Sequence, residues 1–193
     1  MKQKKTLADV EAMSPEKLQE DLENLSPYIY DAIKDRLDEI PVNIQEALVQ
    51  KIPLPRKLML KYRIPFNRHQ MREIALEAIY QNLLLGKDIR RALYDVLDGS
   101  NEVNGYLYSL AVGTIENKDE YIELLSKKLR SDWTFERLPL LEQAILLMST
   151  QEILENGTPK AAVINEAITL TKEYCDAESP KLINAILDSL PNE

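Results

Sequence analysis

The feature that most constrains this chain is the spacing of its apolar residues, which recur at intervals of three and four along most of its length. Near the carboxyl end, Ile183, Ile186, Leu187 and Leu190 occupy positions i, i+3, i+4 and i+7, so a helix places all four on one face. No run with the two-residue alternation of a half-buried strand competes with this pattern, and the chain has only five glycines. The sequence therefore predicts an all-α fold.

Prolines and helix caps divide the chain into two parts. Serine suits the N-cap and proline the first helical position, so Ser14-Pro15, Ser26-Pro27 and Ser179-Pro180 are expected helix starts. Three prolines mark an extended connection, at Pro53, Pro55 and Pro65. We expect residues 1–64 to form a helical N-terminal extension with a proline-rich basic linker, and residues 65–193 to form an all-α domain in which Gly86 stops the first helix.

Composition excludes several classes of protein. The single cysteine, Cys175, excludes an internal disulfide, and the single histidine, His69, excludes a His-rich metal site. No glycine-rich phosphate loop, H-E-x-x-H or nucleophile elbow is present, so we expect neither an enzyme nor a cofactor or metal site. No eighteen-residue apolar run or signal peptide is present, which predicts a cytoplasmic protein that does not enter a membrane.

The charge of the chain is uneven. The net charge is −8, which argues against broad binding to polyanions. Between Ala47 and Arg72, however, there is no acidic residue, and this stretch contains seven lysines and arginines in addition to His69. Basic groups that are concentrated in one place can bind phosphates on an acidic protein, because salt screens the more distant charges.

Four blocks in the second part are distinctive: "REIALEAIYQ" (Arg72–Gln81), "DWTFERLPLLEQAILLMSTQEIL" (Asp132–Leu154), "AVINEAITLTKEY" (Ala162–Tyr174) and "SPKLINAILD" (Ser179–Asp188). In this order they resemble the NusB family of transcription antitermination proteins. The resemblance covers about residues 67–193 and implies two packed three-helix units. It also implies a non-catalytic protein that binds single-stranded boxA RNA together with NusE, a small-subunit ribosomal protein, and joins the RNA polymerase complex during ribosomal RNA transcription.

The resemblance also suggests site residues. Arg68, His69 and Arg72 stand where the family has an Arg-rich run, and Arg68 and Arg72 are one helical turn apart. Tyr80 and Tyr174 match aromatic positions at which a base can stack. Glu178 and Lys181 flank the start of the last helix, where the family approaches RNA, and Glu142 stands where it approaches NusE. His69 and Gln70 replace arginines of the family, and Leu182 replaces a phenylalanine.

These replacements leave a second hypothesis open, namely a protein-interaction module or homodimer that keeps the fold without specific RNA binding. Structural roles are also open for individual residues. Tyr80 and Tyr174 are equally well explained as partly buried core residues. Asn165 and Asn184 interrupt apolar stripes, so we expect their amides to tie helices together. Glu166 is expected to be a structural acid, and Trp133 is expected to anchor the core.

Overall fold

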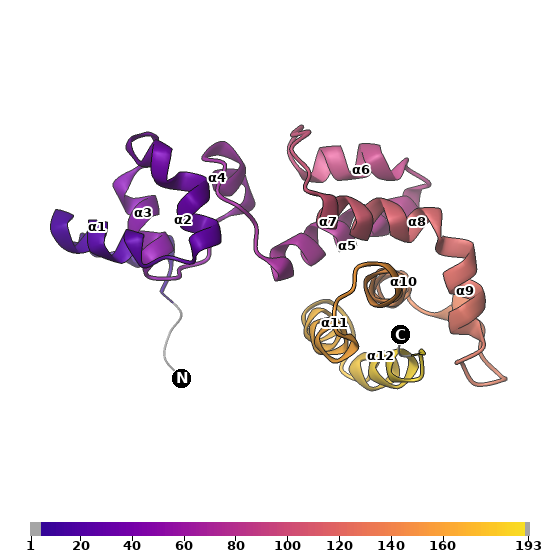
Figure 1. Ribbon diagram of the computed structural model, residues 1–193. Helices are drawn as coiled ribbons and strands as arrows, with labels where there is room; N and C mark the ends of the chain where they lie inside the picture. Colours follow the sequence, from indigo (N-terminus) through magenta and orange to yellow (C-terminus); the bar gives the residue numbers. More distant parts are fainter. Residues whose placement is uncertain (1–4, 192–193) are drawn as a thin grey trace. The chain divides into compact units, whose positions relative to one another are not determined.

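The computed structural model describes residues 5–191, and every regular element among them is a helix (Figure 1). The all-α prediction is therefore confirmed. The chain divides into two compact units, with the division between Asn67 and Arg68. The sequence placed this division three residues earlier. Among residues 5–191, no helix combines the length and the apolar character that crossing a membrane would require.

The N-terminal unit is a small helical unit with its own core. Its α-helices are α1 (Pro15–Glu23), α2 (Pro27–Ile33), α3 (Val42–Val49) and α4 (Arg56–Lys61), and it has 3₁₀ turns at Leu7–Asp9 and Lys34–Glu39. As predicted, α1 and α2 start at the two Ser-Pro pairs, and the Ser14 side chain accepts a hydrogen bond from the Lys17 amide. The core consists of Ile33, Ile40, Ile44, Ala47, Ile52, Leu54, Met59 and Ile64.

The proline-rich segment belongs to this core, although the sequence suggested an extended linker. Helix α3 ends with Lys51 in the left-handed region (φ 55°), and the Ile52 amide then donates to the Ala47 carbonyl at 2.8 Å. Helix α4 ends in the same way, with Arg63 (φ 49°) followed by Ile64. This is the Schellman arrangement, in which the apolar residue after the left-handed one packs back on the helix. Both isoleucines are consequently buried, and a proline follows each.

The C-terminal unit consists of two sets of three helices and one additional helix. The first set is α5 (Arg68–Leu85), α6 (Ile89–Val96) and a helix formed by α7 (Gly105–Tyr108), a π-helical segment (Ser109–Gly113) and α8 (Thr114–Glu116). The second set is α10 (Leu140–Glu155), α11 (Lys160–Tyr174) and α12 (Ser179–Asp188). Helix α9 (Lys118–Ser126) packs on α10, and a 3₁₀ turn (Phe135–Arg137) precedes α10. Gly86 ends α5 as predicted (φ 64°).

Helix α10 lies at the centre of the C-terminal unit (Figure 1). It packs against α5 of the first set and against α11 and α12 of its own set. All its residues from Glu142 to Ile153 are buried, which is typical of a helix that is covered on every side. Its polar side chains, such as Glu142, Gln151 and Glu152, therefore need partners within the unit, since burial of an unpaired polar group costs free energy.

The π-helical segment brings a glycine against one of these polar side chains. Tyr121 donates from its hydroxyl to Gln151 Oε1 at 2.7 Å, and Gln151 Nε2 donates to Ser109 Oγ at 3.2 Å. A Cβ atom added at Gly113 would lie 2.5 Å from Gln151 Nε2. The Gln151 amide therefore fits against Gly113 because this residue has no side chain.

We predict that Gly113→Ala lowers the free energy of unfolding by about 1–3 kcal/mol, because it displaces a buried, hydrogen-bonded amide in a packed interior. Guanidinium denaturation measures the change. Gly105→Ala is the matched control, because a Cβ there meets no atom within 4 Å. If both variants unfold at the same denaturant concentration as the unaltered protein, the packing at Gly113 is looser than the structure indicates.

Candidate functional site

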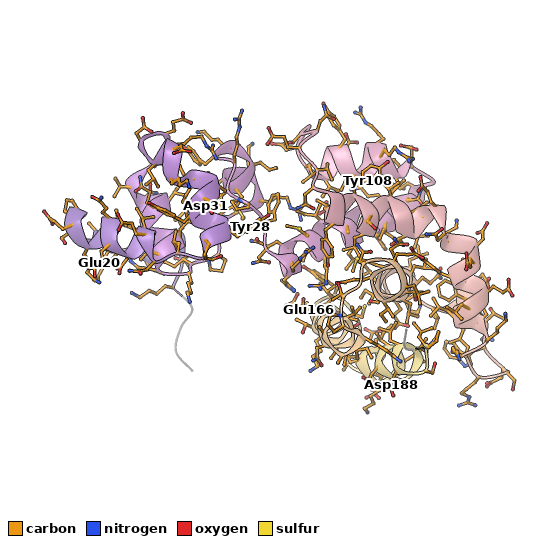
Figure 2. The ribbon with its side chains drawn as sticks, in the orientation of Figure 1. Glu20, Tyr28, Asp31, Tyr108, Glu166 and Asp188 are labelled. Carbon is orange, nitrogen blue, oxygen red and sulfur yellow. The ribbon has the colours of Figure 1, made fainter. Side chains whose placement is uncertain are left out.

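The start of α5 and the carboxyl-terminal half of α11 lie side by side and bring four of the predicted site residues together. His69 Nδ1 lies 3.1 Å from Glu166 Oε2, and the Tyr174 hydroxyl donates to Glu73 Oε1 at 2.7 Å. Figure 2 labels Glu166 on the side of α11 near the start of α5. Arg68, His69, Arg72 and Tyr174 therefore share one region, which we call the α5–α11 face. We define it by these four residues together with Glu73, Glu166 and Glu173.

Arg68 is the exposed cation of this face. It is the first residue of α5, and its guanidinium lies 3.6 Å from the centroid of the Tyr106 ring. Stacking on an aromatic ring holds a guanidinium in place and leaves its N–H edge available for hydrogen bonds. The first turn of a helix also favours anions, because the helix dipole places partial positive charge there. Arg68 is therefore placed where it can bind a phosphate.

Arg72 fits its predicted role least well, because its guanidinium is buried and paired within the protein. Its Nε and Nη2 donate to the two carboxylate oxygens of Glu152 at 2.8 and 2.6 Å, and Nη1 lies 3.3 Å from Glu166. The Tyr106 hydroxyl donates to the same Glu152 carboxylate at 2.8 Å. A phosphate would have to displace Glu152 in order to reach Arg72. We therefore revise the expected role of Arg72 from phosphate contact to a structural ion pair.

The electrostatics of this pair agree with its geometry. Burial opposes the charge of the Arg72 guanidinium, but the hydrogen bond and negative charge of Glu152 outweigh that effect and raise the pKa of Arg72. Burial of the Tyr106 phenol, together with the nearby Glu152 carboxylate, raises the pKa of Tyr106. Both shifts favour a charged Arg72 guanidinium and a neutral Tyr106 phenol that donates to Glu152.

Tyr174, Glu178 and Lys181 follow one another around the junction of α11 and α12. The Tyr174 side chain is 46% exposed, so its ring is accessible to solvent, although its hydroxyl is held by Glu73. Glu178 and Lys181 form an ion pair at 3.0 Å in which both side chains are at least 80% exposed. Such a pair adds little stability and opens easily, so both groups are available to a ligand.

Two of the predicted site residues, Tyr80 and Glu142, lie outside the α5–α11 face. Tyr80 is partly buried and lies twelve residues beyond Arg68 on α5, about 18 Å along the helix axis at 1.5 Å per residue. Glu142 is buried on α10 and accepts a hydrogen bond from Ser179 Oγ at 2.5 Å. A buried carboxylate that fixes the start of α12 has little surface to offer a partner protein, so a direct contact of Glu142 with NusE stays a prediction.

Sequence reasoning misplaced three polar or aromatic residues and missed others. Asn165 and Asn184 are exposed, although their amides were expected to join helices, because both lie on the outer faces of α11 and α12. Trp133 is 44% exposed, not buried in the core, and lines a groove of about 430 Å³ with Leu182 and Ile186. Glu73, Glu152 and Glu173 were missed, because no local pattern distinguishes them from solvated acids.

Cys175 shows no sign of a reactive thiol. Burial, reinforced by the negative charges of Glu142 and Asp176, raises the pKa of Cys175 to about 11. The thiolate is the reactive form, so the cysteine is protonated and unreactive at neutral pH.

Comparisons with known proteins agree on one family. The sequence matches the NusB family over residues 69–191. The transcription antitermination protein NusB of Nitratiruptor sp. is 34% identical over 129 residues, which cover 65% of this chain and 92% of that protein. The NusB protein of Lacticaseibacillus paracasei is 36% identical over 123 residues, which cover 63% of this chain and 91% of that protein.

Solved structures show the same relationship. The structure of T. maritima NusB superimposes with a TM-score of 0.58 at 26% identity and covers 65% of this chain and 90% of that chain. A crystal structure of the antitermination factors NusB and NusE in complex with double-stranded RNA superimposes with a TM-score of 0.56. It is 21% identical and covers 63% of this chain and 93% of that chain, so it supports the fold alone.

Proposed function

We propose, because this chain belongs to the NusB family, that it is a non-enzymatic, RNA-binding transcription antitermination factor. The observation that carries this proposal is the match over residues 69–191 to relatives that are named as transcription antitermination proteins. The chain acts on ribosomal RNA transcription in the cytoplasm, where it recognises boxA-type single-stranded RNA with NusE and joins the RNA polymerase complex.

The α5–α11 face and the start of α12 support RNA binding through exposed groups of two kinds. Arg68 at the start of α5 and Lys181 on α12 supply positive charge for phosphates, and Tyr174 supplies an exposed ring for a base. Membership of the NusB family suggests NusE as the protein partner, and one NusB was solved together with NusE and double-stranded RNA. The acids Glu73, Glu166 and Glu173 weaken the attraction of this face for polyanions. We therefore propose that NusE is needed for tight binding.

The test is fluorescence anisotropy of a labelled boxA RNA and a scrambled RNA, each titrated with the full chain in the presence and absence of NusE. We expect a preference for boxA that strengthens when NusE is present. Equal and weak binding to both RNAs under all conditions would contradict the proposed function.

A salt series makes the phosphate contacts measurable. We predict that Arg68→Ala combined with Lys181→Ala makes the slope of log K against log salt concentration shallower by about 1.4, since each phosphate contact to a single strand contributes about 0.7. Lys127→Ala is the matched control, because Lys127 is an exposed lysine at the C-cap of α9. An unchanged slope in the double variant would show that these two residues do not contact phosphates.

The burial of Arg72 favours one alternative function. With Arg72 committed to Glu152, and with Leu182 in place of an aromatic residue, a NusB fold that serves as a protein-interaction module or a homodimer is the second candidate. Analytical ultracentrifugation of the full chain and of residues 68–193 distinguishes the two. A dimer that also lacks a boxA preference would support the alternative, whereas a monomer that prefers boxA would exclude it.

A further inference from the structure

The only histidine of the chain lies among carboxylates on the α5–α11 face. His69 and Glu73 are four residues apart on α5, and Glu173 faces them from α11. One donor atom from each of these three residues lies within 4.8 Å of the other two. His69 Nε2 is 3.8 Å from Glu173 Oε2, which is too long for a hydrogen bond. One imidazole nitrogen and two carboxylates from two different helices therefore converge on one point.

Neighbouring groups orient two of these three side chains. His69 Nδ1 lies 3.1 Å from Glu166 Oε2, so in the tautomer that carries its proton on Nδ1 this nitrogen donates to Glu166. Nε2, 3.8 Å from Glu173 Oε2, then has a lone pair for a ligand. Glu166 is in turn 3.3 Å from the Arg72 guanidinium. Glu73 accepts from the Tyr174 hydroxyl at 2.7 Å. A histidine that donates from one nitrogen to a carboxylate, and offers the other nitrogen, is the usual arrangement of a metal-binding histidine.

We propose that His69, Glu73 and Glu173 bind a divalent transition-metal ion, with Zn²⁺ as the best match. Zn²⁺ accepts nitrogen and oxygen ligands at about 2.0–2.2 Å, so two ligands of a tetrahedral ion lie about 3.4 Å apart. The Nε2–Oε2 distance of 3.8 Å is close to that value, and both side chains are exposed enough to adjust. Three protein ligands leave the fourth position to water. Imidazole selects Zn²⁺ over Mg²⁺, which prefers oxygen ligands.

The charge of this region also favours a cation. Two carboxylates, from Glu73 and Glu173, lie beside His69, whereas the nearby Arg72 is already paired with Glu152 and Glu166. A bound divalent ion compensates this negative charge. Metal binding does not depend on the proposed RNA-binding function, because the ligands are all side chains of the chain itself and no RNA is needed.

The test is a titration of the full chain with Zn²⁺ at neutral pH without RNA. Isothermal titration calorimetry measures the affinity and the number of bound ions, and the ¹⁵N resonances of the imidazole report which ring nitrogen binds the ion. Because His69 is the only histidine, its two ring nitrogens are assigned without ambiguity. We expect one equivalent to bind, with the larger shift at Nε2. Mg²⁺ at the same concentration is expected to leave the imidazole resonances unchanged.

Variants separate this site from adventitious binding. His69→Gln and Glu173→Gln each remove a ligand and are expected to weaken Zn²⁺ binding at least about tenfold, and Glu166→Gln to weaken it about 10–100-fold through the orientation of His69. Glu155→Gln and Cys175→Ser are controls, since Glu155 is an exposed acid of α10 and Cys175 is the only thiol. Both variants are expected to bind Zn²⁺ as tightly as the unaltered protein does.

Two outcomes would overturn the proposal. One is Zn²⁺ binding that His69→Gln and Glu173→Gln leave unchanged, which would place the ion elsewhere. The other is an imidazole whose nitrogens both stay protonated when Zn²⁺ is added, which would show that His69 is an imidazolium paired with Glu166 and Glu173.

Discussion

Replacement of Arg72 by alanine is expected to lower the free energy of unfolding of the C-terminal unit by about 3–5 kcal/mol, because it leaves a buried carboxylate without its guanidinium. The Glu152 side chain is 1% exposed and receives two hydrogen bonds from Arg72. Without them, Glu152 keeps the hydrogen bond from the Tyr106 hydroxyl but loses its positively charged partner. Denaturation followed by the fluorescence of Trp133 measures the effect, since this tryptophan is the only one in the chain and lies in the C-terminal unit.

Two controls make this result specific. Arg68→Ala, four residues earlier on α5, removes an exposed arginine and one cation–π contact and is expected to cost less than about 1 kcal/mol. Arg72→Met combined with Glu152→Met removes both charges and is expected to recover much of the loss, because an uncompensated buried charge is the main penalty. A loss below about 1 kcal/mol for Arg72→Ala would mean that water reaches Glu152.

Replacement of Tyr174 by alanine is expected to weaken binding of boxA RNA about 5- to 150-fold, which corresponds to the roughly 1–3 kcal/mol of stacking on one base. The ring is 46% exposed, and the hydrogen bond from its hydroxyl to Glu73 limits its rotation. An aromatic ring that is held in this way loses little freedom when a base stacks on it. Fluorescence anisotropy with NusE present measures the change in affinity.

Tyr174→Phe and Tyr108→Ala are the matched controls. The phenylalanine keeps the ring and removes the hydroxyl that donates to Glu73, so we expect most of the affinity to be kept. Tyr108 is 43% exposed on α7 and is well separated from Glu166 in Figure 2, so its removal tests for a general effect of losing an exposed tyrosine. If Tyr174→Phe binds as weakly as Tyr174→Ala, the hydroxyl and not the ring is the important group.

The helices and the family were readable from the sequence alone, because both depend on local patterns. Apolar spacing predicted the α-helices, Ser-Pro pairs predicted the starts of α1, α2 and α12, and Gly86 predicted the end of α5. These signals act between residues that are at most about four positions apart. The ordered blocks from Arg72 to Asp188 indicated the NusB family, and the match over residues 69–191 confirmed it.

The tertiary structure decided which polar side chains are buried and which partners they contact. Arg68 and Arg72 are equivalent in the sequence, one turn apart in a basic stretch, but the first is exposed and the second is buried against Glu152, eighty residues away. Asn165 was expected to join helices and is exposed, whereas Glu166 beside it contacts both His69 and Arg72. The reason is physical. A helix is specified by neighbours along the chain, whereas the availability of a charge depends on which helices pack against it, and the local sequence does not contain that information.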